Sequence, residues 1–303
     1  TRGVIIVGIS DIKTGDGLKN PAKEAGLLSG DIILSVNKCE INSNEELKKI
    51  VEDSNGATLD AEVMRNNTKY EAHINPVRSV SDDSYKLGVW VRDSSAGIGT
   101  LTFFDPETKS FGGLGHGICD VDTGEILPLS HGDIIQASIN GILKGVRGNP
   151  GELKGYFVDH EPIGYLTQNT YSGVYGVLND KISDAEAVPI AMKQQIKRGK
   201  AQFITTICGT NPEYFDIDIQ SINYSESSPS KNMIIKITDD SLLRKTGGII
   251  QGMSGSPIIQ NGMLVGAITH VFVNDPQKGY AIIAENMISQ LNNAVDTEYK
   301  NVS

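Results

Sequence analysis

The chain has 303 residues, a formal net charge of −10, 39% hydrophobic residues and 33 glycines. This composition is typical of a globular protein that is long enough for one large domain or two ordinary ones, and the glycine content favours β-structure. The acidity argues against nucleic-acid binding, because proteins that bind nucleic acid present a basic face to the phosphates. No run of about 18 apolar residues occurs, so the sequence predicts no membrane-spanning segment.

The chain begins at Thr1, inside what we expect to be a strand, so we interpret it as a processed or trimmed fragment whose signal or anchor segment would lie upstream. Its three cysteines are far apart in the sequence and lack the spacing of metal ligands: Cys39, Cys119 and Cys208. The sequence favours buried thiols, with one disulfide as the alternative in an oxidising compartment.

Residues 1–78 are expected to form a small domain of their own. The β-branched run from Gly3 to Ile9 predicts a strand, and residues 21–27 predict a short helix that ends at a glycine. Three further strands and an amphipathic helix complete the expected domain: strands at 32–37, 57–65 and 69–77, and a helix at 44–51 with Ser43 or Asn44 as its cap.

The stretch Glu24–Asn37, EAGLLSGDIILSVN, resembles the PDZ domains attached to bacterial proteases. PDZ domains bind peptide tails by adding a strand to a sheet edge beside a helix, which here would be the helix at 44–51. In permuted PDZ domains of this kind, the loop that binds the peptide carboxylate precedes the strand that starts near Gly3. It would therefore lie upstream of Thr1 and leave the domain N-terminally incomplete, so both a peptide-binding module and a packing module without a ligand stay open.

Residues 79–303 are expected to form a second, larger domain. The stretch 78–84 at its start is polar and aperiodic and predicts a linker. Short β-prone runs such as 87–91 and 97–104 then alternate with turns, which predicts an all-β barrel or sandwich rather than a βαβ array. Helical patterns are scarce: one at 187–196 and one at 284–295.

A glycine-dense turn at residues 247–259 is the candidate seat of a nucleophile. A serine hydroxyl attacks a carbonyl only when a base takes its proton and N–H donors hold the oxyanion that forms. The glycines around Ser254 allow a tight turn that aims the amides of Gly252 and Ser254 at one point. Ser254 is preferred to Ser256, because only Ser254 has both amides behind it. A plain β-turn between two strands is the alternative.

His116 is the candidate base, since it lies between glycines that leave the imidazole room to approach a substrate. A triad also needs an acid that orients the imidazole. Asp239 ends an apolar run 15 residues before Ser254 and is the first choice, with Asp240 next to it and Asp120, four residues after His116, as alternatives. The Asp239 carboxylate, at the end of its strand, is equally suited to capping the next turn.

Three groups of motifs downstream of the PDZ-like domain together resemble the SpoIVB peptidase family of sporulation serine peptidases, over essentially the whole chain: Gly115-His116-Gly117, the segments 130–133 and 145–152, and Gly252-Met253-Ser254-Gly255-Ser256-Pro257. The resemblance implies a mainly β, chymotrypsin-like double β-barrel after a small α+β PDZ domain. It implies His116 as base, Asp239 as acid and Ser254 as nucleophile, with no cofactor or metal. By analogy with strands that pair with substrate in such proteases, Thr269 and His270 would line the cleft, although core or edge packing is an equal alternative.

The resemblance also implies a biological role. Members of this family are secreted from the forespore into the space between the two sporulation membranes, are membrane-associated before processing, and cut themselves. They then cleave a membrane-bound regulator of the SpoIVFA type, which triggers sigma-K activation in the mother cell. The alternative is a catalytically inactive PDZ-containing scaffold that binds sporulation membrane proteins.

Overall fold

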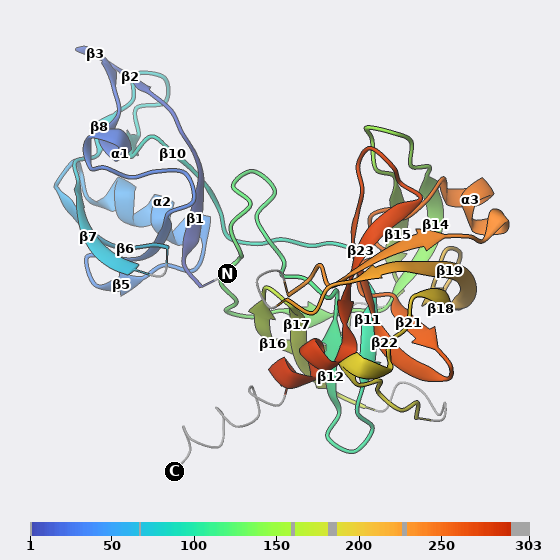
Figure 1. The fold of residues 1–303 in the computed structure, drawn as a ribbon. Coiled ribbons are helices and arrows are strands. Elements are labelled where there is room, and N and C mark those ends of the chain that lie inside the picture. The colour runs from blue at the N-terminus through green and yellow to red at the C-terminus, as the bar shows by residue number, and fades with distance from the viewer. Residues whose placement is uncertain (1, 67, 159–160, 181–186, 226–228, 292–303) are drawn as a thin grey trace. The chain divides into compact units, whose positions relative to one another are not determined.

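The computed structural model describes residues 2–66, 68–158, 161–180, 187–225 and 229–291 (Figure 1). Contacts divide the chain into two compact units, which are described separately. The first unit is Thr1–Ala96 with Cys119–His131, and the second is Gly97–Ile118 with Gly132–Ser303. Among the described residues, no helix has both the length and the apolar character needed to cross a bilayer.

The first unit is built on one mixed-length antiparallel sheet with strand order β10-β1-β4-β6-β7, and β5 pairs with β4. Two helices accompany the sheet (Figure 1), and α2 carries a capping box in which Ser43 and Glu46 satisfy each other's backbone N–H groups. The elements are β1 Val4–Ile9, β2 Ile12–Thr14, β3 Gly17–Lys19, α1 Pro21–Glu24, β4 Ile32–Val36, β5 Cys39–Glu40, α2 Asn44–Asp53, β6 Leu59–Arg65, β7 Thr68–Ile74, β8 Val77–Arg78, β9 Tyr85–Lys86 and β10 Val89–Arg92.

The C-terminal end of this unit differs from the sequence prediction. Residues 79–84 connect the paired strands β8 and β9 rather than forming an extended linker, and β10 pairs with β1 along Val89–Arg92. By its contacts the first compact unit extends to Ala96, because this edge strand is held by a partner about 80 residues earlier in the chain.

A groove of about 480 Å³ lies in the first unit between α2 and the segment 85–91. Leu47 and Val51 of α2 line one side, and Gly88 lies on the other. At Gly88, with φ of +79°, a Cβ atom would lie 2.6 Å from the carbonyl oxygen of Ser10, so only glycine fits this loop.

A buried ion pair stabilises the turn before β4. The Asp31 carboxylate is 1% exposed and accepts hydrogen bonds from Arg65 Nε at 2.6 Å and from the Tyr70 hydroxyl at 2.8 Å. It also accepts from the Leu28 N–H at 2.8 Å. Burial opposes these bonds, but together they lower the pKa of Asp31 below 3.8, while burial and the Asp31 contact raise the pKa of Tyr70 to about 12.

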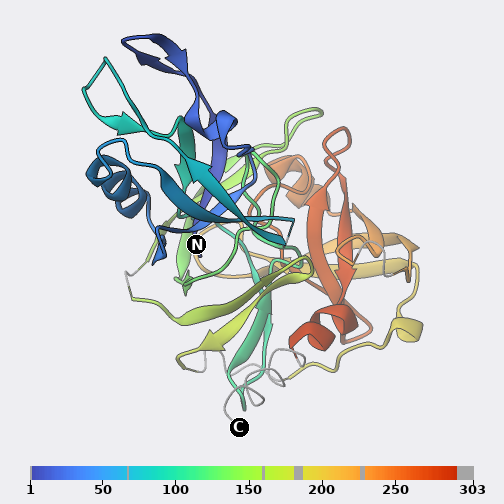
Figure 2. The same ribbon diagram turned by 90° about the vertical axis from the view of Figure 1, so that its left-hand side faces the viewer.

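The second unit contains an antiparallel sheet in the order β11-β12-β17-β16-β13, a β14-β15 hairpin, and a closed barrel in the order β18-β19-β20-β23-β22-β21. Figure 2 shows the orange and red strands of the barrel after a turn of 90° about the vertical axis. The strands are β11 Leu101–Phe104, β12 Ser110–Gly113, β13 Asp133–Ile134, β14 Ala137–Leu143, β15 Glu152–Phe157, β16 Gly164–Thr170, β17 Gly173–Leu178, β18 Gly199–Thr205, β19 Glu213–Ile222, β20 Met233–Ile237, β21 Pro257–Gln260, β22 Met263–Val271 and β23 Lys278–Ile283. Its helices are the 3-10 turn η1 Lys193–Gln195, α3 Asp240–Thr246 and a helix at 284–291.

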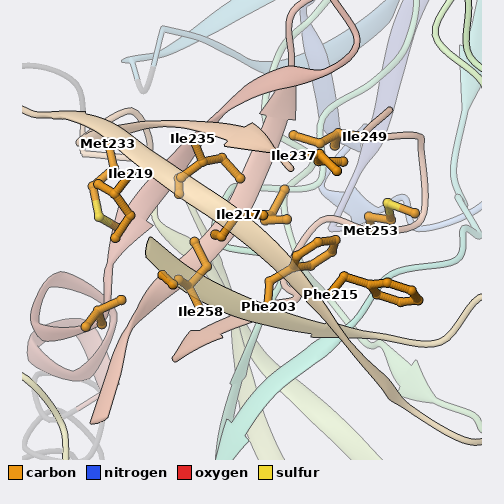
Figure 3. Packing of buried hydrophobic residues seen from close by; sticks show 14 of the residues in the cluster. Phe203, Phe215, Ile217, Ile219, Met233, Ile235, Ile237, Ile249, Met253 and Ile258 are labelled. Carbon is orange, nitrogen blue, oxygen red and sulfur yellow. The ribbon is translucent and has the colours of Figure 1, made fainter. Parts of the chain in front are cut away.

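Alternating side chains of the barrel strands form its core (Figure 3). In β20, Met233, Ile235 and Ile237 are buried and the residues between them are half-buried, as expected for a strand with one face on the core. Phe203 and Phe215 pack with ring centroids 5.8 Å apart. Met253 of the nucleophile turn belongs to the same cluster.

The mainly β fold class is confirmed, with one barrel closed and the other half built from a sheet and a hairpin. Two local expectations were wrong. Residues 187–196 form no α-helix, because the Ala191 N–H pairs with Leu264 O and leaves only the short turn η1. The three cysteines are exposed rather than buried. The predicted C-terminal helix is present at 284–291, and residues 292–295 lie outside the described residues.

Candidate active site

The candidate nucleophile turn, the glycine-dense stretch that holds Ser254, lies between α3 and β21. The Met253 side chain is fully buried in the barrel core, and its packing there holds the turn against the barrel. Gly252 and Gly255 have φ of +97° and +90°, and a Cβ atom on Gly255 would lie 2.1 Å from the Thr100 carbonyl oxygen. The glycines predicted to permit a tight turn are therefore required by both backbone conformation and close approach.

The N–H groups of Gly252 and Ser254 differ from those of Met253 and Gly255, the residues that follow each of them. Met253 N donates to Ile250 O, and Gly255 N donates to Ile268 O at 2.8 Å. Within the described residues, by contrast, the N–H groups of Gly252 and Ser254 donate no hydrogen bond. These are the two amides that the sequence predicts for an oxyanion hole.

Ser254 is half-buried, and β22 holds its side chain. The Ser254 hydroxyl donates to the Thr269 carbonyl oxygen at 2.8 Å. The backbone carbonyl oxygen of Ser254 accepts from Thr100 N at 2.9 Å. The Thr269 side chain is buried and donates to Ser230 O at 2.7 Å. Thr269 thus contacts the candidate nucleophile through its backbone, while its side chain serves packing.

His116 lies just after β12, next to the nucleophile turn. The Leu114 N–H donates to Thr100 O, the same residue whose N–H bonds to Ser254. Directly before His116, a Cβ atom on Gly115 would lie 2.8 Å from Thr269 Cγ2. His116 and Ser254 therefore lie near shared neighbours, Thr100 and Thr269 of β22, although no hydrogen bond between described residues joins the imidazole to the Ser254 hydroxyl.

Two interactions of the His116 ring with described residues bear on its chemistry. Its Nδ1 lies 2.8 Å from the Gly117 carbonyl oxygen, and its centroid lies 4.8 Å from that of His270. Burial lowers the pKa of His116 below 6.5, and the Gly117 bond opposes this shift only in part. Burial, then the nearby His116 and Lys231, lower the pKa of His270 to about 4. His270 Nδ1 has no hydrogen-bond partner among the described atoms.

The three candidate acids lie elsewhere. Asp239 is the N-cap of α3, where its carboxylate accepts from Ser241 Oγ at 2.6 Å and Leu242 N at 3.0 Å, and Asp240 is the first helical residue. Asp120 belongs to the first unit, where it pairs with Arg92. No hydrogen bond or ion pair between described residues joins any of the three carboxylates to the His116 ring.

Asn169 is a neighbour of this site that the sequence analysis did not identify. From β16, its side-chain amide bonds to both backbone groups of Ile118, with Oδ1 accepting from Ile118 N and Nδ2 donating to Ile118 O, each at 2.8 Å. A single asparagine between polar residues of a strand has no sequence pattern that points to a distant histidine. Only the pairing of the chain segments reveals it.

The chain matches two family models. One, described as SpoIVB peptidase S55, matches residues 83–288, and one for the PDZ domain matches residues 8–75. No curated protein matches the chain.

Several solved structures match at low identity. The Rv3671c protease from M. tuberculosis in its active form is 16% identical, with a TM-score of 0.33 over 66% of this chain and 91% of that one. The HtrA-type protease AlgW with a decapeptide is 12% identical, with a TM-score of 0.33 over 50% of this chain and 43% of that one. The PDZ domain of an SdrC-like protein from Listeria monocytogenes is 18% identical, with a TM-score of 0.25 over 31% of this chain and 90% of that one.

The family assignment rests on the family models, and the peptidase model spans more than half of the chain. The matched range includes the glycine-flanked segments around His116 and Ser254 and the strands of the closed barrel. The chain belongs to the SpoIVB peptidase S55 family and is a serine endopeptidase that carries a PDZ domain.

Proposed function

We propose that Ser254 is the nucleophile and His116 the general base of a two-step acyl transfer. The observation that supports this assignment is the gathering of both residues around Thr269 and His270, beside two turn amides that bond to no described residue. A hydroxyl, an imidazole and two oxyanion donors are the groups that such a reaction needs.

The reaction begins when the Ser254 hydroxyl turns from Thr269 O toward the imidazole. His116 takes its proton as the oxygen attacks the peptide carbonyl, and the N–H groups of Gly252 and Ser254 hold the oxyanion. The imidazolium then protonates the leaving amine, and an acyl-enzyme remains. Water, deprotonated by His116, attacks the ester and releases the acid product and the free serine. We further propose that Thr269 and His270 border the bound substrate.

Labelling with a fluorophosphonate probe tests the assignment. The wild-type protein should form one adduct, and Ser254→Ala should form none while keeping the wild-type melting temperature. Ser256→Ala is the matched control, because Ser256 lies in the same turn, and should still label. An unlabelled wild-type protein, or an adduct that persists in Ser254→Ala, would overturn the proposal.

One observation favours the inactive scaffold as a second candidate: the Ser254 hydroxyl bonds to Thr269 O, and no described carboxylate contacts His116. The same labelling experiment separates the two functions. A folded protein that never labels, yet binds peptide through its PDZ domain, is a scaffold.

We also propose the biological role suggested by the family. The chain would be membrane-associated before processing, reach the space between the two sporulation membranes by secretion from the forespore, and cut itself. It would then cleave a membrane-bound regulator of the SpoIVFA type and so trigger sigma-K activation. Co-expression with such a regulator in an endospore-forming host tests this role, since cleavage of both proteins should stop in Ser254→Ala. Persistent cleavage of either protein in that variant would assign the cut to another enzyme.

Peptide tails are the proposed ligands of the groove between α2 and β10, whose edge strand is open to one more strand. Trp90, the single tryptophan, lines this groove and is 66% exposed, so its fluorescence reports binding directly. Titration with a peptide that has a free C-terminal carboxylate should change the Trp90 emission with saturation. The same peptide with an amidated C-terminus is the control and should bind more weakly.

A further inference from the structure

The peptide group between Gly117 and Ile118 is held at both ends by side chains. At one end its carbonyl oxygen lies 2.8 Å from His116 Nδ1. At the other end its N–H donates to Asn169 Oδ1 at 2.8 Å. One amide plane therefore joins the catalytic imidazole to Asn169.

We infer that Asn169 is a positioning residue that orients His116 through the Gly117–Ile118 peptide group. The inference rests on the proposed role of His116 as base. No hydrogen bond between described residues joins Asn169 to Ser254, and the proposed mechanism gives Asn169 no contact with the substrate, so its effect on the reaction is transmitted through the backbone.

Hydrogen-bond chemistry fixes the protonation of the ring. A carbonyl oxygen only accepts, so the Nδ1 that contacts Gly117 O carries the hydrogen in the neutral imidazole. Nε2 is then the unprotonated nitrogen, which is the form that a base for Ser254 requires. In a triad an aspartate selects this tautomer. Here a backbone carbonyl makes the contact.

The same donor and acceptor rules fix the orientation of the Asn169 side-chain amide. Ile118 N–H can only donate and Ile118 O can only accept, so Oδ1 must face the nitrogen and Nδ2 the oxygen. Two bonds from one planar group clamp Ile118 against β16. Asn169 itself is held in register opposite Val174 of β17. The loop that carries His116 is thereby attached to a paired strand.

The hydrogen bond from Ile118 N–H to Asn169 also strengthens the one between Gly117 O and His116 Nδ1. Acceptance of the Ile118 N–H by Asn169 polarises the shared peptide group and makes the Gly117 oxygen a better acceptor. When His116 takes the serine proton, its Nδ1–H becomes a stronger donor, so the hydrogen bond from Nδ1 to Gly117 O strengthens as the ring becomes charged. Asn169 therefore supports both the orientation of the ring and the positive charge that it gains.

Nitrogen NMR on Ser254→Ala protein with labelled histidine tests the tautomer without catalysis. The His116 signal should show a protonated Nδ1 at neutral pH, and Asn169→Ala should shift the ring toward a mixture of tautomers. A protonated Nε2 in the starting protein, or an unchanged tautomer in Asn169→Ala, would overturn the inference, whether or not the wild-type enzyme labels with fluorophosphonate.

Kinetics of the active protein supply the second readout. In Asn169→Ala, kcat/KM should fall by about a hundredfold, mostly in kcat, because the base is misplaced rather than the substrate. The acid limb of the pH profile should move to lower pH in Asn169→Ala and to higher pH in Asn169→Asp, which keeps an acceptor for Ile118 N–H and adds a negative charge.

Asn179, which directly follows β17 of the same sheet, provides a matched control, since its Nδ2 donates to the backbone oxygen of Pro162 at 2.7 Å. Asn179→Ala should leave kcat and the pH profile unchanged. If Asn169→Ala and Asn179→Ala behave alike, or if the two Asn169 variants shift the acid limb in the same direction, Asn169 is structural only. Should Asn169→Ala fail to fold, Asn169→Asp and the NMR of the starting protein still decide.

Discussion

At the scale of single residues, the electrostatics around His116, the proposed general base, are unusual for that role. Its ring lies against His270, another imidazole, and against a backbone carbonyl. Burial lowers the pKa of both rings, to about 4 for His270. Two neutral imidazoles side by side avoid the repulsion that two charged rings would have. The base is therefore kept unprotonated at pH values where an ordinary histidine would be half charged.

The acid limb of kcat/KM should reflect this lowered pKa. We expect activity to rise with an inflection below pH 6.5 and to remain flat above it, because the free-enzyme profile reports the base that must be unprotonated. Hydrolysis of a peptide substrate across pH 4 to 9 measures the limb. An inflection at or above pH 6.5 would show that a carboxylate stabilises the imidazolium, contrary to the contacts seen here.

At the scale of elements, Asp239 at the start of α3 has one observed role and one predicted role. Asp239 was predicted as the triad acid, and in the structure it caps α3 through Leu242 N. Whether it also acts in catalysis stays a prediction. A cap needs an acceptor at this position, whereas an acid needs a charge, so substitution can separate the two roles.

Asp239→Ala should lower the free energy of unfolding by about 1 kcal/mol, because the cap is lost, while Asp239→Asn should keep most of the stability. Ser43→Ala, which removes the cap of α2, is the matched control for the size of the effect. Thermal unfolding and kcat are measured together. A fall in kcat by about 10⁴ in Asp239→Asn at wild-type stability would assign the carboxylate to the triad, and an unchanged kcat would restrict it to the cap.

Elements with a strong local period were predictable from the sequence. The capped helix α2, the strands of the first sheet and the nucleophile turn follow from spacing, caps and glycines, which act over a few residues. The pairing of β10 with β1 was missed, because it joins segments about 80 residues apart. The contact of Asn169 with Ile118 was missed for the same reason, as the two lie 51 residues apart. Cysteine exposure depends on which side of a turn faces solvent, and no local pattern gives that.

At the scale of the whole molecule, the two units carry different acid-sensitive groups. In the first unit the pKa of Asp31 is lowered below 3.8, so its contribution to stability is complete above that value and is lost only as the pH falls further. In the second unit the pKa of His270 is lowered from 6.5 to about 4, so the unfolded chain binds a proton that the folded barrel excludes across that window.

We therefore expect the second unit to lose stability as the pH falls from about 6.5 to about 4, while the Asp31 contribution to the first unit persists. Hydrogen exchange resolved by peptide should show faster exchange in β20, β22 and β23 over this window. His270→Phe removes the group that must take up the proton, and should flatten the pH dependence of the barrel alone. Equal pH dependence in the variant and the wild type would contradict this account.

The burial of Met253 has a thermodynamic consequence for the enzyme as a whole. The Met253 side chain, between the two proposed oxyanion amides, belongs to the hydrophobic core of the barrel, so the same packing stabilises both the turn and the fold. Loss of the oxyanion site and melting of the barrel then form one cooperative transition. On heating, the population should divide into molecules that are fully competent and molecules that are unfolded, with no folded form in which the turn alone has relaxed.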